Sequence, residues 1–212
     1  FKPKRKTRAS IAREKGLEVL ADLIGRQDDK LDLHNEAQKF INVENGLETE
    51  EEVIQGASDI IAENVSDDAE LRKSIRKLYE KAAKIESRAS DENAETVYQN
   101  YYEFCEPVSK IADHRILALD RGEKEGALKV SVSIDEEFCF SIAERKYVIN
   151  NTDSGNIVKA AVQDSCKRLI MPSVEREIRA ELTARAAEGA IKVFSSNLRQ
   201  LLLQPPIKNS VT

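Results

Sequence analysis

Five cationic side chains lie within the first eight residues of the sequence. They are Lys2, Lys4, Arg5, Lys6 and Arg8. A cluster this dense can neutralise phosphates, and its affinity for nucleic acid should fall steeply as the salt concentration rises. The same charges could instead form a solvated terminus or pair with acidic helices elsewhere in the chain. The run is a candidate nucleic-acid-binding site, with both interpretations open.

No set of residues with catalytic potential forms a constellation. The sequence contains neither a G-x-x-x-x-G-K-[ST] phosphate loop, nor a G-x-S-x-G nucleophile elbow, nor an H-E-x-x-H zinc motif. His114 lies between Asp113 and Arg115, which could indicate acid–base chemistry, but no second catalytic group is placed beside it. A structural role at the entry of a strand is favoured. We expect no catalytic residue, no cofactor and no enzymatic activity in these residues.

The cysteines argue against a disulfide framework or a metal site. Cys105, Cys139 and Cys166 are odd in number and widely spaced, none forms a C-x-x-C pair, and His34 and His114 lie far apart. Buried free thiols in a reducing compartment are the better interpretation, without a metal.

Composition sets broader limits. The chain has 212 residues, 41% hydrophobic and 33% charged, which is typical of a folded domain. The net charge of -5 argues against a protein that coats nucleic acid with its whole surface, although it permits a local basic patch. No window approaches the roughly 18 apolar residues of a membrane span, and no signal peptide opens the chain. We therefore expect a cytoplasmic protein without a membrane partner.

Helical patterns dominate the first part of the chain. Apolar residues at helical spacing predict a helix pair or one bent helix over residues 9–26 and a weaker helix over 32–41. Thr49 with Glu52, and Asp67 with Glu70, have the spacing of capping boxes that begin two further helices. The second of these carries a basic face, which is a weaker nucleic-acid candidate because it is also the solvated side expected of an amphipathic helix. That face comprises Arg72, Lys73, Arg76, Lys77, Lys81 and Lys84.

The middle of the chain changes character. Residues 87–100 indicate a connector, followed by an aromatic cluster (Tyr98, Tyr101, Tyr102 and Phe104) that we expect to pack under a loop rather than stack on bases. The apolar run 115–119 and the alternating run 128–134 then predict a β-hairpin with a charged loop at residues 121–126.

The last part is helical again. One apolar stripe is predicted to end at Pro172, and Ser173 to cap a helix of about 30 residues, or roughly 45 Å, that stops at Pro205-Pro206. The predicted fold is mainly α: a multi-helical scaffold with one small β-hairpin and a long C-terminal connecting helix. Three regions follow: a helical region at residues 1–105, a hairpin-containing segment at 106–150, and a helical region at 151–212 that leads to a further domain.

Three runs together resemble the Tex family of bacterial transcription accessory proteins. The first is Lys2-Pro-Lys-Arg-Lys-Thr-Arg8 with Ala12-Arg-Glu-Lys-Gly-Leu17, the second is Glu106-Pro107 with His114-Arg-Ile-Leu-Ala-Leu119, and the third is Pro172-Ser-Val-Glu-Arg-Glu-Ile-Arg179 with Leu201-Leu-Leu-Gln-Pro-Pro206. Their joint order and spacing make the resemblance specific and extend it over essentially the whole chain.

The resemblance implies an elongated, largely helical protein that acts in transcription and binds nucleic acid. In that family this region precedes an RNase-H-like domain, helix-hairpin-helix elements and an S1 domain. The resemblance thus implies a central scaffold that positions RNA- or DNA-binding domains absent from these residues, with nucleic acid and possible transcription machinery as partners. The alternative is a helical protein–protein adaptor that docks onto transcription machinery without touching nucleic acid.

Overall fold

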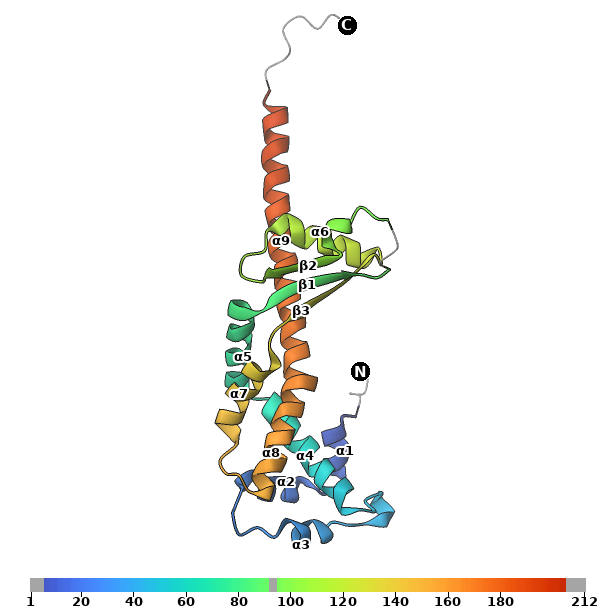
Figure 1. The fold of residues 1–212 in the computed structure, drawn as a ribbon, viewed down its shortest axis with the longest axis vertical. Coiled ribbons are helices and arrows are strands. Elements are labelled where there is room, and N and C mark those ends of the chain that lie inside the picture. Colours follow the sequence, from blue (N-terminus) through green and yellow to red (C-terminus); the bar gives the residue numbers. More distant parts are fainter. Residues whose placement is uncertain (1–5, 92–94, 205–212) are drawn as a thin grey trace, which may run out of the picture. The chain divides into compact units, whose positions relative to one another are not determined.

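The computed structural model describes residues 6–91 and 95–204. The chain divides into two compact units, each built from two separate segments. The first combines the residues up to Leu78 with Asp135–Val174, and the second combines Tyr79–Ile134 with the residues from Glu175 onward. Figure 1 shows the elements and their labels.

The first unit is helical. Its elements are α1 (Arg8–Glu14), α2 (Glu18–Arg26), α3 (Leu33–Gln38), the short 3-10 turn η1 (Val43–Asn45), α4 (Glu50–Ser66), most of α5 (Ala69–Ala82), α7 (Glu136–Tyr147), α8 (Asp153–Asp164), the π-helical turn η3 (Ser165–Ile170) and the start of α9 (Met171–Leu202). The predicted helix of residues 9–26 is thus a pair, and it breaks at Gly16, which has a positive φ of 83° that glycine adopts without strain.

Capping residues fix where these helices begin. Thr49 and Glu52 form the predicted reciprocal capping box at the start of α4. Asp67 does not cap the next helix as predicted; it ends α4, and the carboxylate of Asp68 accepts bonds from the amides of Glu70 and Leu71. The sequence presents two adjacent aspartates, and only the connection between the helices decides which one caps.

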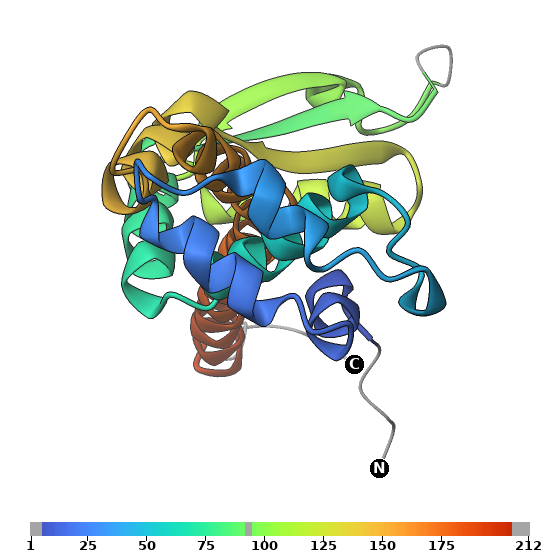
Figure 2. The same cartoon turned by 90° about the horizontal axis from the view of Figure 1, so that it is seen from below.

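Helix α4 is the centre of this unit. Helices α1, α2 and α8 and the turn η3 all pack against it, and Figure 2 shows α1 and α2 beside it. Small residues permit this close packing. A Cβ atom on Gly56 would lie 2.4 Å from Cδ1 of the buried Leu17, so glycine is needed for Leu17 to occupy its site.

A buried amide fixes the turn between α7 and α8. Gln27, with a φ of 53° and only 2% of its surface exposed, donates from Nε2 to the carbonyl of Tyr147 at 2.7 Å. Its Oε1 accepts from the amide of Ile149 at 2.9 Å. Asn150 returns a bond from Nδ2 to the carbonyl of Gln27 at 3.2 Å. Gly155 completes the arrangement, because a Cβ there would lie 1.9 Å from the carbonyl oxygen of Asn150.

The second unit contains a three-stranded antiparallel sheet in the order β2-β1-β3, with helix α6 (Asp113–Lys124) alongside it (Figure 1). The strands are β1 (Lys84–Ala89), β2 (Glu103–Pro107) and β3 (Leu128–Ser133). The register pairs Ile85 with Val132 and places both on the buried face. Two carboxylates cover the free edge of β3: Glu175 accepts from the amide of Val132 at 2.9 Å, and Glu123 accepts from that of Val130 at 3.4 Å.

The predicted hairpin is correct only in its second strand. Residues 115–119 lie in α6, where Ile116 and Leu119 are buried at a helical spacing of three. The charged stretch expected as a hairpin loop forms the last turn of this helix and its cap, Glu125. The partner of β3 is β1, within which residues 87–89 were expected to form part of a connector.

The long helix begins without the break expected at Pro172. Helix α8 continues through η3 into α9, and the amide of Met171 bonds to the carbonyl of Cys166. Proline lacks an amide donor, so it interrupts a regular α-helical ladder. Here it follows a turn whose bonding is already shifted to the π pattern, which accommodates the missing donor.

The fold class is confirmed: the protein is mainly helical, with one small antiparallel β element and a long C-terminal helix. No helix in the described part of the chain combines the length and apolar character needed to cross a membrane.

The close approach at Gly155 yields a prediction with a matched control. Gly155→Ala should destabilise the protein by about 1–3 kcal/mol, because the methyl group meets fixed backbone. Gly25→Ala in α2 meets no atom within 4 Å and should stabilise it by up to about 1 kcal/mol through helix propensity. Urea unfolding followed by circular dichroism measures both, and equal effects would contradict the packing at Gly155.

A second prediction concerns pH. Hydrogen bonds from Lys146 and Tyr147 hold the pKa of Asp68 well below its usual range, so its contribution to stability is complete above the unfolded pKa of about 4 and is lost as the pH falls below it. Asp68→Asn should therefore cost about 1–2 kcal/mol at pH 7 and progressively less toward pH 3. Urea titrations at pH 3–7 measure this, with Asp22→Asn on the exposed face of α2 as the charge-matched control. A pH-independent cost would contradict this account.

Candidate nucleic-acid interface

The predicted basic run is only partly within the described residues. Lys2, Lys4 and Arg5 lie outside them. Lys6 is exposed and pairs with Glu14 at 2.7 Å, which supports the ion-paired interpretation for this residue. An exposed pair of this kind contributes little to stability, so a phosphate could replace Glu14 at small cost. Arg8 forms no ion pair with the other described residues and is exposed.

The basic face expected on α5 is partly committed to structure. The guanidinium of Arg72 donates to Oγ of Ser173 at 2.7 Å and to the carbonyl of Ser66 at 3.3 Å. Lys73 and Lys77 remain exposed. Arg72 therefore joins helix termini of the first unit and is not available as a phosphate contact.

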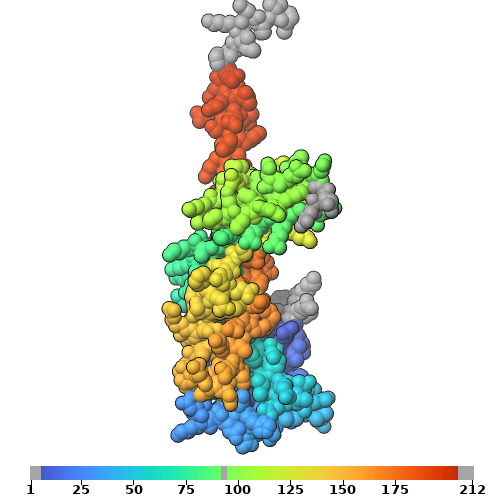
Figure 3. Space-filling view, viewed as in Figure 1, coloured from blue at the N-terminus to red at the C-terminus, as the bar shows by residue number. Residues whose placement is uncertain are grey.

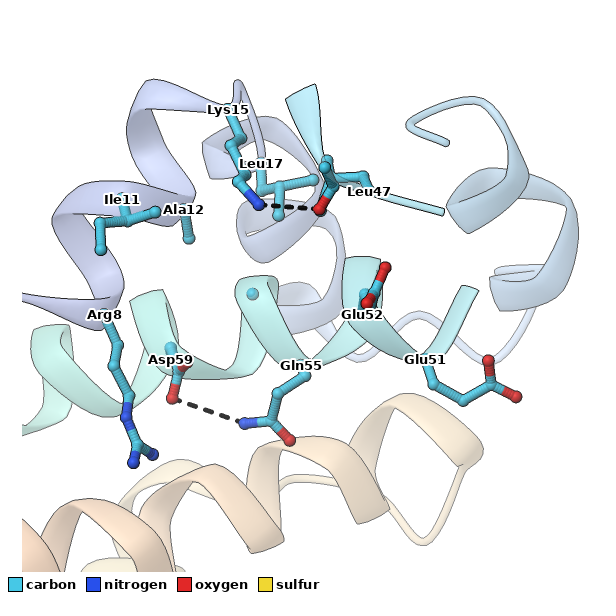
Figure 4. A pocket seen from close by; sticks show the side chains of 12 residues that line it. Arg8, Ile11, Ala12, Lys15, Leu17, Leu47, Glu51, Glu52, Gln55 and Asp59 are labelled. Carbon is cyan, nitrogen blue, oxygen red and sulfur yellow. Dashed lines mark hydrogen bonds between the residues drawn. The ribbon is translucent and has the colours of Figure 1, made fainter. Parts of the chain in front are cut away.

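A pocket of about 550 Å³ lies between α1 and α4, at the end of the basic run (Figure 4). Its apolar wall is formed by Ile11, Ala12, Leu17 and Leu47. Lys15 closes one side by donating from Nζ to the carbonyl of Gly46 at 2.9 Å. Arg8 lines the pocket as well, so a cation of the candidate site borders an apolar slot.

Asp59 is the unusual residue of this pocket. It lies on α4 with only 9% of its surface exposed, and two donors approach its Oδ1: Nε2 of Gln55 at 3.5 Å and the guanidinium of Arg168 at 3.7 Å. Its Oδ2 accepts no hydrogen bond from any residue that the structure describes. Burial raises the pKa of the Asp59 carboxyl, while the nearby guanidiniums of Arg168 and Arg8 oppose that shift. Asp59 was not among the predicted site residues, although its position beside Ile60 and Ile61 on an apolar helix face indicates a buried carboxylate.

The other candidate residues are dispersed. Tyr98 is buried and donates its hydroxyl proton to Glu125 at 2.8 Å, while the ring of Phe104 packs 5.3 Å from that of Tyr101. This packing agrees with a structural role for the cluster. His114 is exposed near the start of α6, so the expected position at a strand entry is wrong.

The cysteines differ among themselves. Cys139 and Cys166 are buried free thiols, and burial raises their pKa to about 11 and about 12, so both stay protonated and unreactive. Cys105 is exposed on β2, which contradicts the expected burial. Among the described residues, no three His, Cys, Asp or Glu side chains gather where a metal ion could bind.

An apolar surface continues along α9 after its burial ends. Ile178, Leu182 and Ala186 are buried in the second unit, and from Ala187 onward nearly every described residue is exposed. The apolar pattern nevertheless persists. We define the α9 stripe as the exposed residues Ile191, Phe194, Leu198, Leu201 and Leu202, which follow one another on one face of the helix; Val193 is exposed beside them. Figure 3 shows these last turns of α9 standing clear of α6 and the sheet.

A groove of about 530 Å³ forms the base of the α9 stripe. Leu117 of α6 and Val193 and Phe194 of α9 line it. Helices α6 and α9 lie close together beside this groove. Arg185 of α9 pairs with Asp113 of α6 at 3.0 Å, and a Cβ atom on Gly189 would lie 2.7 Å from Oδ2 of Asp113. Large exposed apolar patches often mark interaction sites in soluble proteins, so the groove and the α9 stripe are candidates for a docking surface.

Comparison with known proteins identifies relatives along the whole chain. It is 45% identical to the uncharacterized protein YdcI of Bacillus subtilis, over 98% of this chain and 30% of that protein. It is 31% identical to the transcriptional accessory protein Tex of Neisseria gonorrhoeae, over 97% of this chain and 28% of that protein. It is also 31% identical to the human S1 RNA-binding domain-containing protein 1, over 95% of this chain and 21% of that protein.

The chain thus spans less than a third of the length of these relatives. A family model described as Tex central region-like matches residues 28–194, which include all of α4, the sheet and most of α9. The match covers well over half of the sequence and agrees with the resemblance carried by its three runs. The chain therefore belongs to the Tex family, as its central region.

Proposed function

We propose that this chain is the central scaffold of a cytoplasmic transcription accessory factor and that it positions nucleic-acid-binding modules without performing a reaction itself. The observation that carries this proposal is the α9 stripe, where a long helix presents apolar side chains that nothing in the described residues covers. Relatives named as a transcriptional accessory protein and an S1 RNA-binding domain-containing protein support the assignment.

The stripe fits a scaffold because burying its exposed apolar side chains against a partner would release free energy. Phe194 is 67% exposed and Leu202 is 76% exposed. Fully burying a side chain of this kind contributes about 1.5–3 kcal/mol, so several of them supply enough energy to hold a neighbouring module against the helix. In the Tex family further domains follow this region, and they are the occupants we propose.

Direct nucleic-acid contact is a secondary part of the proposal. Arg8 is exposed and unpaired among the described residues, and Lys6 holds only an exposed partner. These cations would add phosphate contacts to the affinity of the downstream modules. A protein–protein adaptor is the second candidate function, and the apolar groove between α6 and α9 favours it because a partner helix could occupy that groove.

The scaffold role predicts protection of the α9 stripe by the modules that follow it. In a chain extended through the family's downstream domains, amides of residues 191–203 should exchange with deuterium at least about tenfold more slowly than in the present chain. Hydrogen exchange with mass spectrometry measures this, and Phe194→Ser with Leu198→Ser should abolish the protection. Residues 178–186, among which Ile178, Leu182 and Ala186 are buried, provide the internal control. Equal exchange in both chains would contradict docking on this helix.

The nucleic-acid role predicts salt-dependent binding by this chain. Fluorescence anisotropy of labelled single- and double-stranded DNA and RNA should show affinity that weakens as salt rises. Replacing Lys4, Arg5 and Arg8 with alanine should weaken it and lower the salt slope by roughly the number of lost phosphate contacts.

The matched control replaces Lys30, Lys39 and Lys159, three exposed cations of the same unit, and makes the same change in net charge. Equal losses in both triple variants would indicate a nonspecific charge effect. Absence of binding at low salt would leave the chain as a spacer or adaptor.

A further inference from the structure

The slot between α1 and α4 has an acceptor that the fold leaves unused. Both donors near Asp59 approach Oδ1, and Oδ2 accepts no bond from the described residues. Within the described residues, the fully buried side-chain atoms without a hydrogen bond are Oγ of Ser165 and Nη1 of Arg179, so Oδ2 of Asp59 keeps some accessible surface that a ligand could occupy. The pocket beside it is large enough for a small ring system, and its wall at Ile11, Leu17 and Leu47 is apolar. Figure 4 shows Asp59 and Arg8 near one end of the slot and Leu47 toward the other.

The charges around Asp59 decide which chemistry fits. Arg168 lies 3.7 Å from its carboxylate, and Arg8 is close enough to act on it electrostatically. A ligand that placed a full positive charge there would face two guanidiniums, and an anion would face the carboxylate itself. The best ligand is therefore a neutral group with N–H donors and an apolar face, connected to a negative charge that Arg8 can meet.

An unpaired nucleobase attached to its phosphate has this combination. Guanine presents two adjacent N–H donors on its Watson–Crick edge, which match the acceptors of a carboxylate. Adenine and cytosine place an acceptor beside their amino group, and uracil places acceptors on both sides of its single N–H. Recognition of single strands commonly uses hydrogen bonds to this edge of a splayed base.

We propose that the slot binds an unpaired guanine of a single-stranded nucleic acid, with both carboxylate oxygens of Asp59 accepting from the two donors of its Watson–Crick edge and Arg8 beside its phosphate. Oδ1 can take part because its contacts with Gln55 and Arg168 are long, at 3.5 Å and 3.7 Å. The aliphatic side chains at Ile11, Leu17 and Leu47 contact the faces of the base. The proposal rests on the nucleic-acid part of the proposed function and adds a base preference to it. A lysine side chain of a protein partner is the rival occupant, and the two guanidiniums beside Asp59 disfavour it.

The first test uses the unmodified chain. In ¹H–¹⁵N NMR titrations, GMP should shift the amides of residues 55–59 and 8–12 and bind about tenfold more tightly than AMP, CMP or UMP, which is the discrimination expected of a two-donor base contact. Equal shifts with all four nucleotides, centred on Lys6 and Arg8, would overturn the proposal in favour of a phosphate contact. Shifts with N-acetyl-lysine amide and none with GMP would overturn it in favour of a peptide.

The second test uses variants and oligonucleotides. Asp59→Asn should remove the preference for GMP, whereas Glu51→Gln, an exposed carboxylate on the same pocket rim, should keep it. Thermal unfolding checks that both variants fold. If Asp59→Asn does not fold, the nucleotide titration of the unmodified chain tests the proposal by itself. An RNA octamer of uridines with one central guanosine should bind about tenfold more tightly than the all-uridine octamer. Equal binding of the two octamers would contradict the guanine site but not the proposed nucleic-acid contact. Binding of neither octamer would contradict both.

Discussion

Helix α4 is enclosed by its neighbours over most of its surface, and the rest of the first unit is arranged around that enclosure. Helices α1, α2 and α8 and the turn η3 all pack on it, which requires small residues where the approach is closest. The absence of a side chain at Gly56 leaves room for Leu17, which directly follows the break between α1 and α2 at Gly16. Because interiors are packed at crystal-like density, one position on α4 sets the spacing of two other helices.

That enclosure also explains why Asp59 is unusual. An aspartate on the exposed side of an amphipathic helix needs no partner, but α4 has little exposed side. Asp59 is held among buried residues, with Arg168 and Gln55 as weak partners, and the slot beside it remains open. Burial of a charged group without full compensation is costly, and carboxylates whose pKa is raised by burial beside a pocket are candidates for functional sites.

Local signals in the sequence were sufficient for the helices and not for the sheet. The capping box at Thr49 and the apolar stripe of α9 act within a few residues, so their outcome was predictable. Strand β1 was missed because its buried face includes Ser87, whose hydroxyl bonds to the carbonyl of Tyr101, and no local periodicity encodes that partner. Residues 115–119 were assigned to a strand because a short apolar run fits both structures; burial of Ile116 and Leu119 against the second unit selected the helix.

The candidate sites show the same division. Periodicity extended the apolar pattern of α9 to Leu201, but only the structure shows that burial ends at Ala186 and that the remainder forms a surface. A core helix and a docking helix have the same apolar spacing, since both need one apolar face. What separates them is whether the partner lies within the described chain. The α9 stripe has none there, and the proposed function therefore assigns its partner to the modules that follow this region in the family.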